Sequence, residues 1–106
     1  MTITFSGSIQ PVANTVHIVG TISASGVYVF KSDIGQMLAG DEIELRIADR
    51  VGAGTVSCIY LASYAHNQAT QVKISPPFVT EVGGGHVSLV QRAGSPRWFY
   101  FSVLSI

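Results

Sequence analysis

Ionisable side chains are scarce in this chain. Asp, Glu, Lys and Arg make up 11% of its 106 residues, whereas about 25% is usual for a soluble domain. Six basic residues balance six acidic ones, so the formal net charge is zero, and neither nucleic acid nor a strongly charged partner is expected. A net charge near zero favours association. We therefore expect other subunits to cover much of the surface, as in a homo-oligomer; a monomer with a Ser- and Thr-rich exterior is the alternative.

Cysteine and long hydrophobic runs are also lacking. Cys58 is the single cysteine, which excludes an internal disulfide. It lies in phase with Val56 and Tyr60 in "TVSCIYLASY", and we expect it to be a small buried side chain of a strand. The apolar runs are too short for a membrane span, and "MTITFSGS" has neither the basic region nor the apolar stretch of a secretory signal. These absences predict no membrane partner and synthesis in a cytoplasm.

The apolar residues that are present recur mostly at every second position, which is the period of a β-strand. In "EIELRIAD", Ile43, Leu45 and Ile47 face one way, while the charged side chains between them face the other. This pattern predicts a half-buried antiparallel strand. Comparable segments occur along the whole chain, at residues 2–6, 15–23, 27–30, 55–65, 72–74, 87–89 and 98–106; the segment at 72–74 ends at Pro76-Pro77, with residues 78–82 as a candidate extension.

Seven or eight such strands, separated by turns rich in Gly, Ser and Pro, predict an all-β protein, an antiparallel β-sandwich in a single domain of residues 1–106. A jelly-roll-like strand order is compatible with this pattern. One segment departs from it, because "SDIGQMLAGD" places Ile34, Met37 and Leu38 at helical spacing. Asp33 before them is a candidate N-cap, and Gly40 after them a candidate stop. We expect one short helical turn near residues 33–39, or a structured loop that joins two strands.

Two of the expected strands, residues 55–65 and 98–106, carry apolar side chains on both faces. Such a strand is central in a sandwich, or a partner covers its outer face. We therefore expect these strands to supply subunit contacts. We also expect Arg97 to anchor the last hairpin by bonding backbone carbonyls or an acid such as Glu81. The predicted interface residues are Ile59, Leu61, Tyr64, Arg97, Trp98 and Tyr100.

No constellation of residues indicates a reaction. His17, His66 and His86 have no metal-ligand spacing with each other or with Cys58, and we expect them to be surface side chains without a role. "VGAGTV" and "EVGGGHV" lack the Lys and the following helix of a phosphate-binding loop. No nucleophile-elbow pattern is present either. We predict no catalytic residue, no metal and no cofactor, and hence a protein that is not an enzyme.

Four aromatic side chains suggest a second hypothesis. Tyr60, Tyr64, Trp98 and Tyr100 are candidates for an exposed platform, because aromatic rings stack on the apolar faces of sugars and lose little side-chain entropy when they are fixed. Their alternate positions on strands favour the core or a subunit interface. Carbohydrate binding, in a free β-sandwich module or in one within a fibre, is the alternative.

The last quarter of the chain resembles small β-rich virion proteins of tailed bacteriophages. In these proteins a strand often ends in Gln, and a short Gly-containing turn, an Arg and alternating aromatics follow up to the C-terminus. The matching residues here are Gln91, Gly94, Arg97, Phe99 and Phe101. The segments "GDEIELRI", "SPPF" and "MTITFSGSI" also look similar, whereas Pro96 and Trp98 stand where the group more often has small residues.

The resemblance implies a structural role without catalysis. Such proteins serve as capsid decoration (cement) subunits, or as parts of heads, tails and fibres. It further implies the major capsid protein or other virion proteins as partners, a homo-oligomer that is commonly a trimer, and assembly into the virion after synthesis in the host cytoplasm. In the alternative, the chain is a carbohydrate-binding module or a fibre or tail component that recognises a host-surface glycan.

Overall fold

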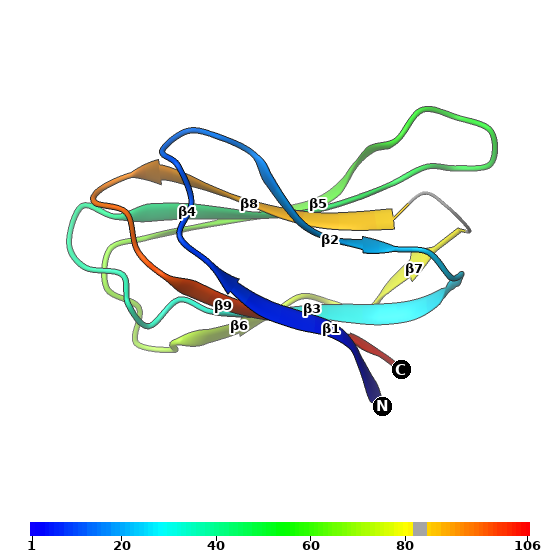
Figure 1. Cartoon of the computed structure of the whole chain (residues 1–106), viewed down its shortest axis with the longest axis horizontal. Coiled ribbons are helices and arrows are strands. Elements are labelled where there is room, and N and C mark those ends of the chain that lie inside the picture. Colours follow the sequence, from blue (N-terminus) through cyan, green and yellow to red (C-terminus); the bar gives the residue numbers. More distant parts are fainter. Residues whose placement is uncertain (82–84) are drawn as a thin grey trace.

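The computed structural model describes residues 1–81 and 85–106, which form nine strands and no helix (Figure 1). In these residues, therefore, no helix is long and apolar enough to cross a membrane. The strands are β1 (Thr2–Ile9), β2 (His17–Ile22), β3 (Gly26–Asp33), β4 (Glu42–Asp49), β5 (Ser57–Ala65), β6 (Val72–Ile74), β7 (Phe78–Thr80), β8 (Gly85–Ala93) and β9 (Phe99–Ser105).

The strands form two antiparallel sheets that pack face to face (Figure 1). The first, here called the β9 sheet, has the order β1-β9-β3-β6, and β7 pairs with the other half of β3. The second, the β8 sheet, has the order β2-β8-β4-β5. The predicted all-β antiparallel sandwich is confirmed, and the strand order is jelly-roll-like.

Alternating side chains of the two sheets fill the space between them. From β4, Ile43, Leu45 and Ile47 point inward, as their spacing predicts, and they are at most 5% exposed. From the opposite sheet, β9 contributes Phe99 and Val103, which are fully buried. Full burial of one such side chain stabilises the fold by about 1.5–3 kcal/mol. The hydrophobic core is therefore continuous from β9 to β4.

The helical turn predicted near residues 33–39 is not formed. Two successive hydrogen-bonded turns replace it: the Met37 N–H donates to the Ile34 carbonyl at 3.2 Å, and the Asp41 N–H donates to the Leu38 carbonyl at 3.0 Å. Ile34 and Met37 are buried, while Leu38 is 50% exposed. The helical spacing of these residues thus has another cause: Ile34 and Met37 are the two side chains by which the loop packs into the core.

β5, which the sequence predicts to be central or to have its outer face covered by a partner, is not central: in the described part of the chain it lies at the edge of the β8 sheet and pairs only with β4. The register of β5 with β4 explains why the prediction of a buried Cys58 is wrong. Ile47 pairs with Tyr60 and Ala48 pairs with Cys58, so Ile59 is an extra residue, a β-bulge. The bulge shifts the alternation, and Cys58 becomes exposed instead of joining Tyr60 on the inner face.

Candidate interaction surface

The outer face of the β9 sheet carries unusually many exposed apolar side chains, and the strand register places them together. Ile3 of β1 pairs with Leu104 of β9. On β3, Val27 pairs with Val79 of β7, and its carbonyl accepts a hydrogen bond from the Ile106 N–H at 2.9 Å. The two chain termini lie together at one end of this sheet (Figure 1). Ile3, Leu104 and Ile106 are near the termini in the sequence, and Val27 and Val79 join them through the hydrogen bond of Val27 to Ile106 and the pairing of Val27 with Val79.

We call these five residues the aliphatic patch: Ile3, Val27, Val79, Leu104 and Ile106. Val79 is 68% exposed, Ile3 61% and Ile106 60%. Single exposed apolar residues are normal on a protein surface, but a contiguous group on a flat sheet face marks an interaction site. Because all five side chains are aliphatic, the patch suits another protein surface better than a small polar ligand.

The opposite end of the same face is polar and aromatic. Tyr100 pairs with Asp33 across β9 and β3, and Ser102 pairs with Lys31 in the next row. Together with Val72 and Phe101, these four residues line a shallow depression of about 170 Å³. Tyr100 is 55% exposed, and Trp98, two residues before it, is 53% exposed. Both predicted interface aromatics of this strand therefore lie open to solvent.

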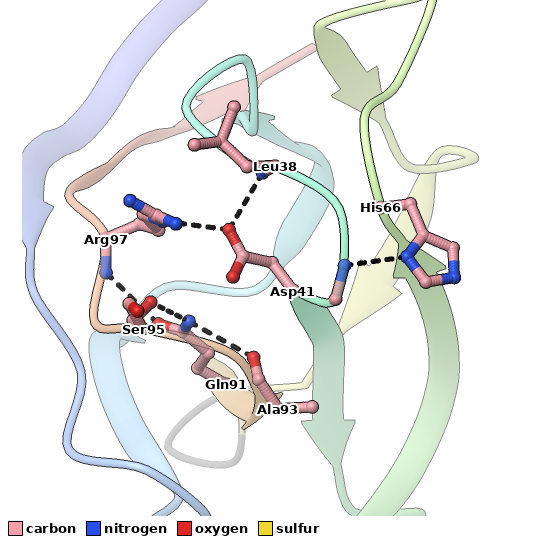
Figure 2. Close-up of polar contacts among 8 residues, drawn as sticks. Leu38, Asp41, His66, Gln91, Ala93, Ser95 and Arg97 are labelled. Atoms are coloured by element: carbon pink, nitrogen blue, oxygen red, sulfur yellow. Dashed lines mark hydrogen bonds and ion pairs between the residues drawn. The ribbon is translucent and has the colours of Figure 1, made fainter.

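A polar network holds the hairpin that carries these aromatics (Figure 2). The Arg97 Nε–H donates to Asp41 Oδ2 at 2.8 Å, and the same oxygen accepts the Leu38 N–H at 2.8 Å. The Gln91 amide accepts the Arg97 N–H at 3.3 Å and donates to the carbonyls of Ala93 and Ser95. The network joins the β3–β4 loop to the β8–β9 hairpin.

Arg97 therefore anchors the last hairpin, as predicted, but its acid partner is Asp41. Of the predicted partners, backbone carbonyls or an acid such as Glu81, an acid is confirmed; Glu81 itself accepts the Gly52 N–H, at 2.9 and 3.1 Å. Asp41 is only 2% exposed. Burial raises the pKa of Asp41, but the Leu38 N–H and the Arg97 guanidinium outweigh this effect and hold the pKa below its ordinary value of 3.8.

Gly94 permits this close approach of the hairpin to the loop. Its φ is +90°, and a Cβ built on it would overlap the Asp41 carboxylate. We expect Gly94→Ala to lower the free energy of unfolding by about 2 kcal/mol, because the new methyl group meets both a strained backbone and a buried side chain. Urea unfolding measures the change. As a control, Ala in place of Gly7, where φ is not positive, should cost less.

The two predicted aromatics of β5 do not join Trp98 and Tyr100. Tyr60 and Tyr64 belong to the other sheet, are half-buried and pack against the core. Burial raises the pKa of Tyr64 above its ordinary value of 10, and the adjacent Tyr60 hydroxyl adds to this effect. The Lys73 ammonium lies 4.8 Å from the centroid of the Tyr64 ring. A platform of all four aromatics is thus excluded by their positions.

The predicted interface residues Ile59 and Leu61 are 47% and 50% exposed on β5, at the edge of the β8 sheet. They therefore lie on a surface separate from the aliphatic patch. Beside them on the outer face, the Glu44 carboxylate is ion-paired with Arg46 and Arg92. The sequence prediction of a wet, charged face for β4 is confirmed.

Two histidines predicted to have no role support turns. The His66 Nδ1 accepts the Gly40 N–H at 2.9 Å (Figure 2), and the His17 Nε2 accepts the Val12 N–H at 3.0 Å. His66 adopts a positive φ of 62°, which is uncommon for a residue with a side chain. Within residues 1–81 and 85–106, no three His, Cys, Asp or Glu side chains are placed to hold a metal ion.

Comparisons with protein families, with curated proteins and with solved structures find no match for this chain. The chain's own residues must therefore carry any functional inference. Sequence reasoning had identified Trp98 and Tyr100 but not the aliphatic patch, although the alternation of Ile3, Leu104 and Ile106 was visible. The sequence does not show that Val27 pairs with Val79, and this pairing is what brings Val79 of β7 to the same face.

Proposed function

We propose that this protein is a non-enzymatic structural subunit of a tailed-phage virion that decorates or cements the capsid. In this proposal it docks the aliphatic patch on the major capsid protein or on another virion protein. It acts in the virion, is made in the host cytoplasm and needs no cofactor. Several copies associate on the shell.

The aliphatic patch carries this proposal. Burial of each of its side chains against a partner would contribute about 1.5–3 kcal/mol before the cost of association is subtracted. The scarcity of charge supports the same conclusion, because only 11% of the residues are Asp, Glu, Lys or Arg and net charge near zero favours association. The phage assignment itself rests on the resemblance of residues 91–103 to small virion proteins. Jelly-roll domains occur in viral capsids, which adds support by analogy of fold.

Virions of the phage whose genome encodes this chain provide the test. We expect mass spectrometry of purified virions to find the protein in many copies per particle, in a ratio to the major capsid protein that is constant between preparations. Its absence from washed virions, together with its presence in the lysate of infected cells, would refute the proposal.

One observation favours a second function, the binding of a glycan by the polar end of the same face. Trp98 and Tyr100 are more than half exposed, and Lys31, Asp33 and Ser102 line the adjacent depression. Rings that stack on a pyranose, next to side chains that hydrogen-bond its hydroxyls, are the usual elements of a sugar site. A fibre or tail component would use such a site to recognise a host-surface glycan.

A glycan array followed by titration calorimetry tests this second function. Tyr100→Ala is expected to weaken binding of any positive glycan about tenfold, which corresponds to the loss of roughly 1.4 kcal/mol of stacking. Tyr60→Phe is the control, since Tyr60 lies in the other sheet. An array without a positive glycan, or equal affinity of both variants, would leave only the structural proposal.

A further inference from the structure

The edge of β5 is open and unprotected. β5 spans nine residues, and among the strands of residues 1–81 and 85–106 it has a neighbour on one side only, so the backbone N–H and C=O groups on its other side face away from the sheet. After the bulge at Ile59, the segment Tyr60–Ala65 is in regular register with β4. Residues 55–65 contain no charge, no Pro and no Gly. Such an edge is a template for another strand.

The other edges of the described sheets carry the usual protection. β1 and β2 each have a register shift and a glycine, Gly7 and Gly20. β6 is three residues long, carries Lys73 and is soon followed by two prolines. Bulges, short strands, lysine and proline are the devices by which natural proteins block edge pairing. Their absence from the regular half of β5 therefore singles out this edge.

We propose that β5 pairs with β5 of a second copy, antiparallel and centred on Ala62, so that two β8 sheets join into one continuous sheet. The inference is independent of the proposed virion function, because it needs only two copies of this chain. It commits to a symmetric dimer, in which the same surface of both copies is used.

The sequence of β5 is self-complementary about Ala62. In "YLASY", residues 60–64, two tyrosines are placed symmetrically around a small central residue. When two copies are centred on Ala62, Tyr60 of one copy faces Tyr64 of the other, and Leu61 faces Ser63. Both tyrosines are on the inner face of their own sheet, so the inner faces of the two copies coincide. Cross-strand aromatic pairs stabilise antiparallel sheets.

Electrostatics also favour a second copy over a charged peptide. Residues 55–65 contain no charged side chain, and the chain as a whole has a net charge of zero. The Lys73 ammonium lies over the Tyr64 ring, so each copy brings one cation near the shared edge, where an aromatic face binds it. The zero net charge still allows two copies to approach. The exposed Ile59 and Leu61 flank the shared edge and would be partly covered by the partner. A single contact between two copies would then account for both Ile59 and Leu61, two of the predicted interface residues.

Position-specific disulfide formation tests the register. In a Cys58→Ser background, Ala62→Cys places the two thiols opposite each other across the dimer axis, at a Cα separation of about 4.5–5.5 Å, which a disulfide can span. Ala65→Cys is the control: it is more exposed, but in this register the two copies of residue 65 lie roughly 20 Å apart. We expect disulfide-linked dimers of Ala62→Cys to form at least tenfold faster under mild oxidation.

Light scattering tests the dimer itself. We expect the wild-type chain to show twice its monomer mass of 11.2 kDa at high concentration. The double variant Leu61→Lys/Ser63→Lys should remain monomeric, because lysine then faces lysine twice across the axis. Ser6→Lys/Ser8→Lys, which adds the same charge at the exposed edge strand β1, should dimerise like the wild type. Circular dichroism verifies that both variants are folded.

Three outcomes would overturn the inference. A wild-type chain that is monomeric or trimeric at every concentration excludes the two-fold pairing. A dimer that persists in the folded Leu61→Lys/Ser63→Lys variant uses another surface. Disulfide formation that is faster at residue 65 than at residue 62 excludes the register. None of these results bears on whether the protein is a virion component.

Discussion

We expect Arg97→Ala to lower the free energy of unfolding by about 3 kcal/mol at pH 7 and the Tm by roughly 10–20 °C. The substitution leaves Asp41, which is 2% exposed, as a buried carboxylate that has lost its cation. The backbone N–H groups of Leu38 and Ser95 still donate to it, but two neutral hydrogen bonds do not offset the cost of burying a charge.

Arg46→Ala is the matched control for this prediction. The side chains of Arg46 and Arg97 are equally exposed, at 28%, and each pairs with an acid. Glu44, the acid beside Arg46, keeps Arg92 as a second partner. We therefore expect Arg46→Ala to cost less than about 1 kcal/mol. Equal losses in the two variants would show that the Arg97–Asp41 pair is an ordinary surface contact.

The pH dependence of the same variant provides a second readout. The pKa of Asp41 is lower in the folded protein than its ordinary value of 3.8. The unfolded chain therefore binds the proton first as the pH falls. The stability that ionised Asp41 contributes is fully present well above pH 4, and it is lost as the pH falls through the pKa that Asp41 has in the folded protein. The difference between wild type and Arg97→Ala should shrink over this acid range.

We expect the double variant Ile3→Asp/Val79→Asp to bind capsids roughly 100-fold more weakly than the wild type. Each substitution places a carboxylate in the middle of the aliphatic patch, and a carboxylate that is buried without a partner costs at least 1.4 kcal/mol, or tenfold in affinity. Both residues are more than 60% exposed in the free protein, so the fold should be preserved. Co-sedimentation with capsids assembled without the protein measures the affinity.

The control double variant is Ile18→Asp/Val51→Asp, in which two exposed aliphatic residues outside the patch receive the same charges. Ile18 is 60% exposed on β2 and Val51 is 85% exposed in the β4–β5 connection. This variant should sediment with capsids like the wild type. Equal loss of binding in both double variants would attribute the effect to net charge, and unchanged binding of Ile3→Asp/Val79→Asp would place the docking face elsewhere.

The alternation of apolar residues along single strands was sufficient to predict an antiparallel β-sandwich and the buried face of β4. Ile43, Leu45 and Ile47 were predicted to be core residues from alternation alone, because in a strand the period of two separates the buried face from the wet face. The same rule placed Phe99 and Tyr100 on opposite faces of their strand. These predictions depend only on neighbours in the sequence, and turns that contain Gly or Pro marked the ends of several strands.

Long-range pairing and irregularities were not predictable in this way. The bulge at Ile59 interrupts the alternation, so Cys58 was placed on the wrong face. Arg97 and Asp41 are 56 residues apart in the sequence, and no local signal distinguishes Asp41 from Glu81 as the partner. The position of β5 at an edge follows from the strand order, which the pattern of a single strand does not contain.

A cryo-electron microscopy map of capsids decorated with the wild-type protein would test the docking claim most directly. The account predicts that the outer face of the β9 sheet, with Val79 and Ile3, lies against the shell and that the charged outer face of the β8 sheet points to solvent. A particle surface without the protein, or a bound protein whose aliphatic patch faces solvent, would contradict it.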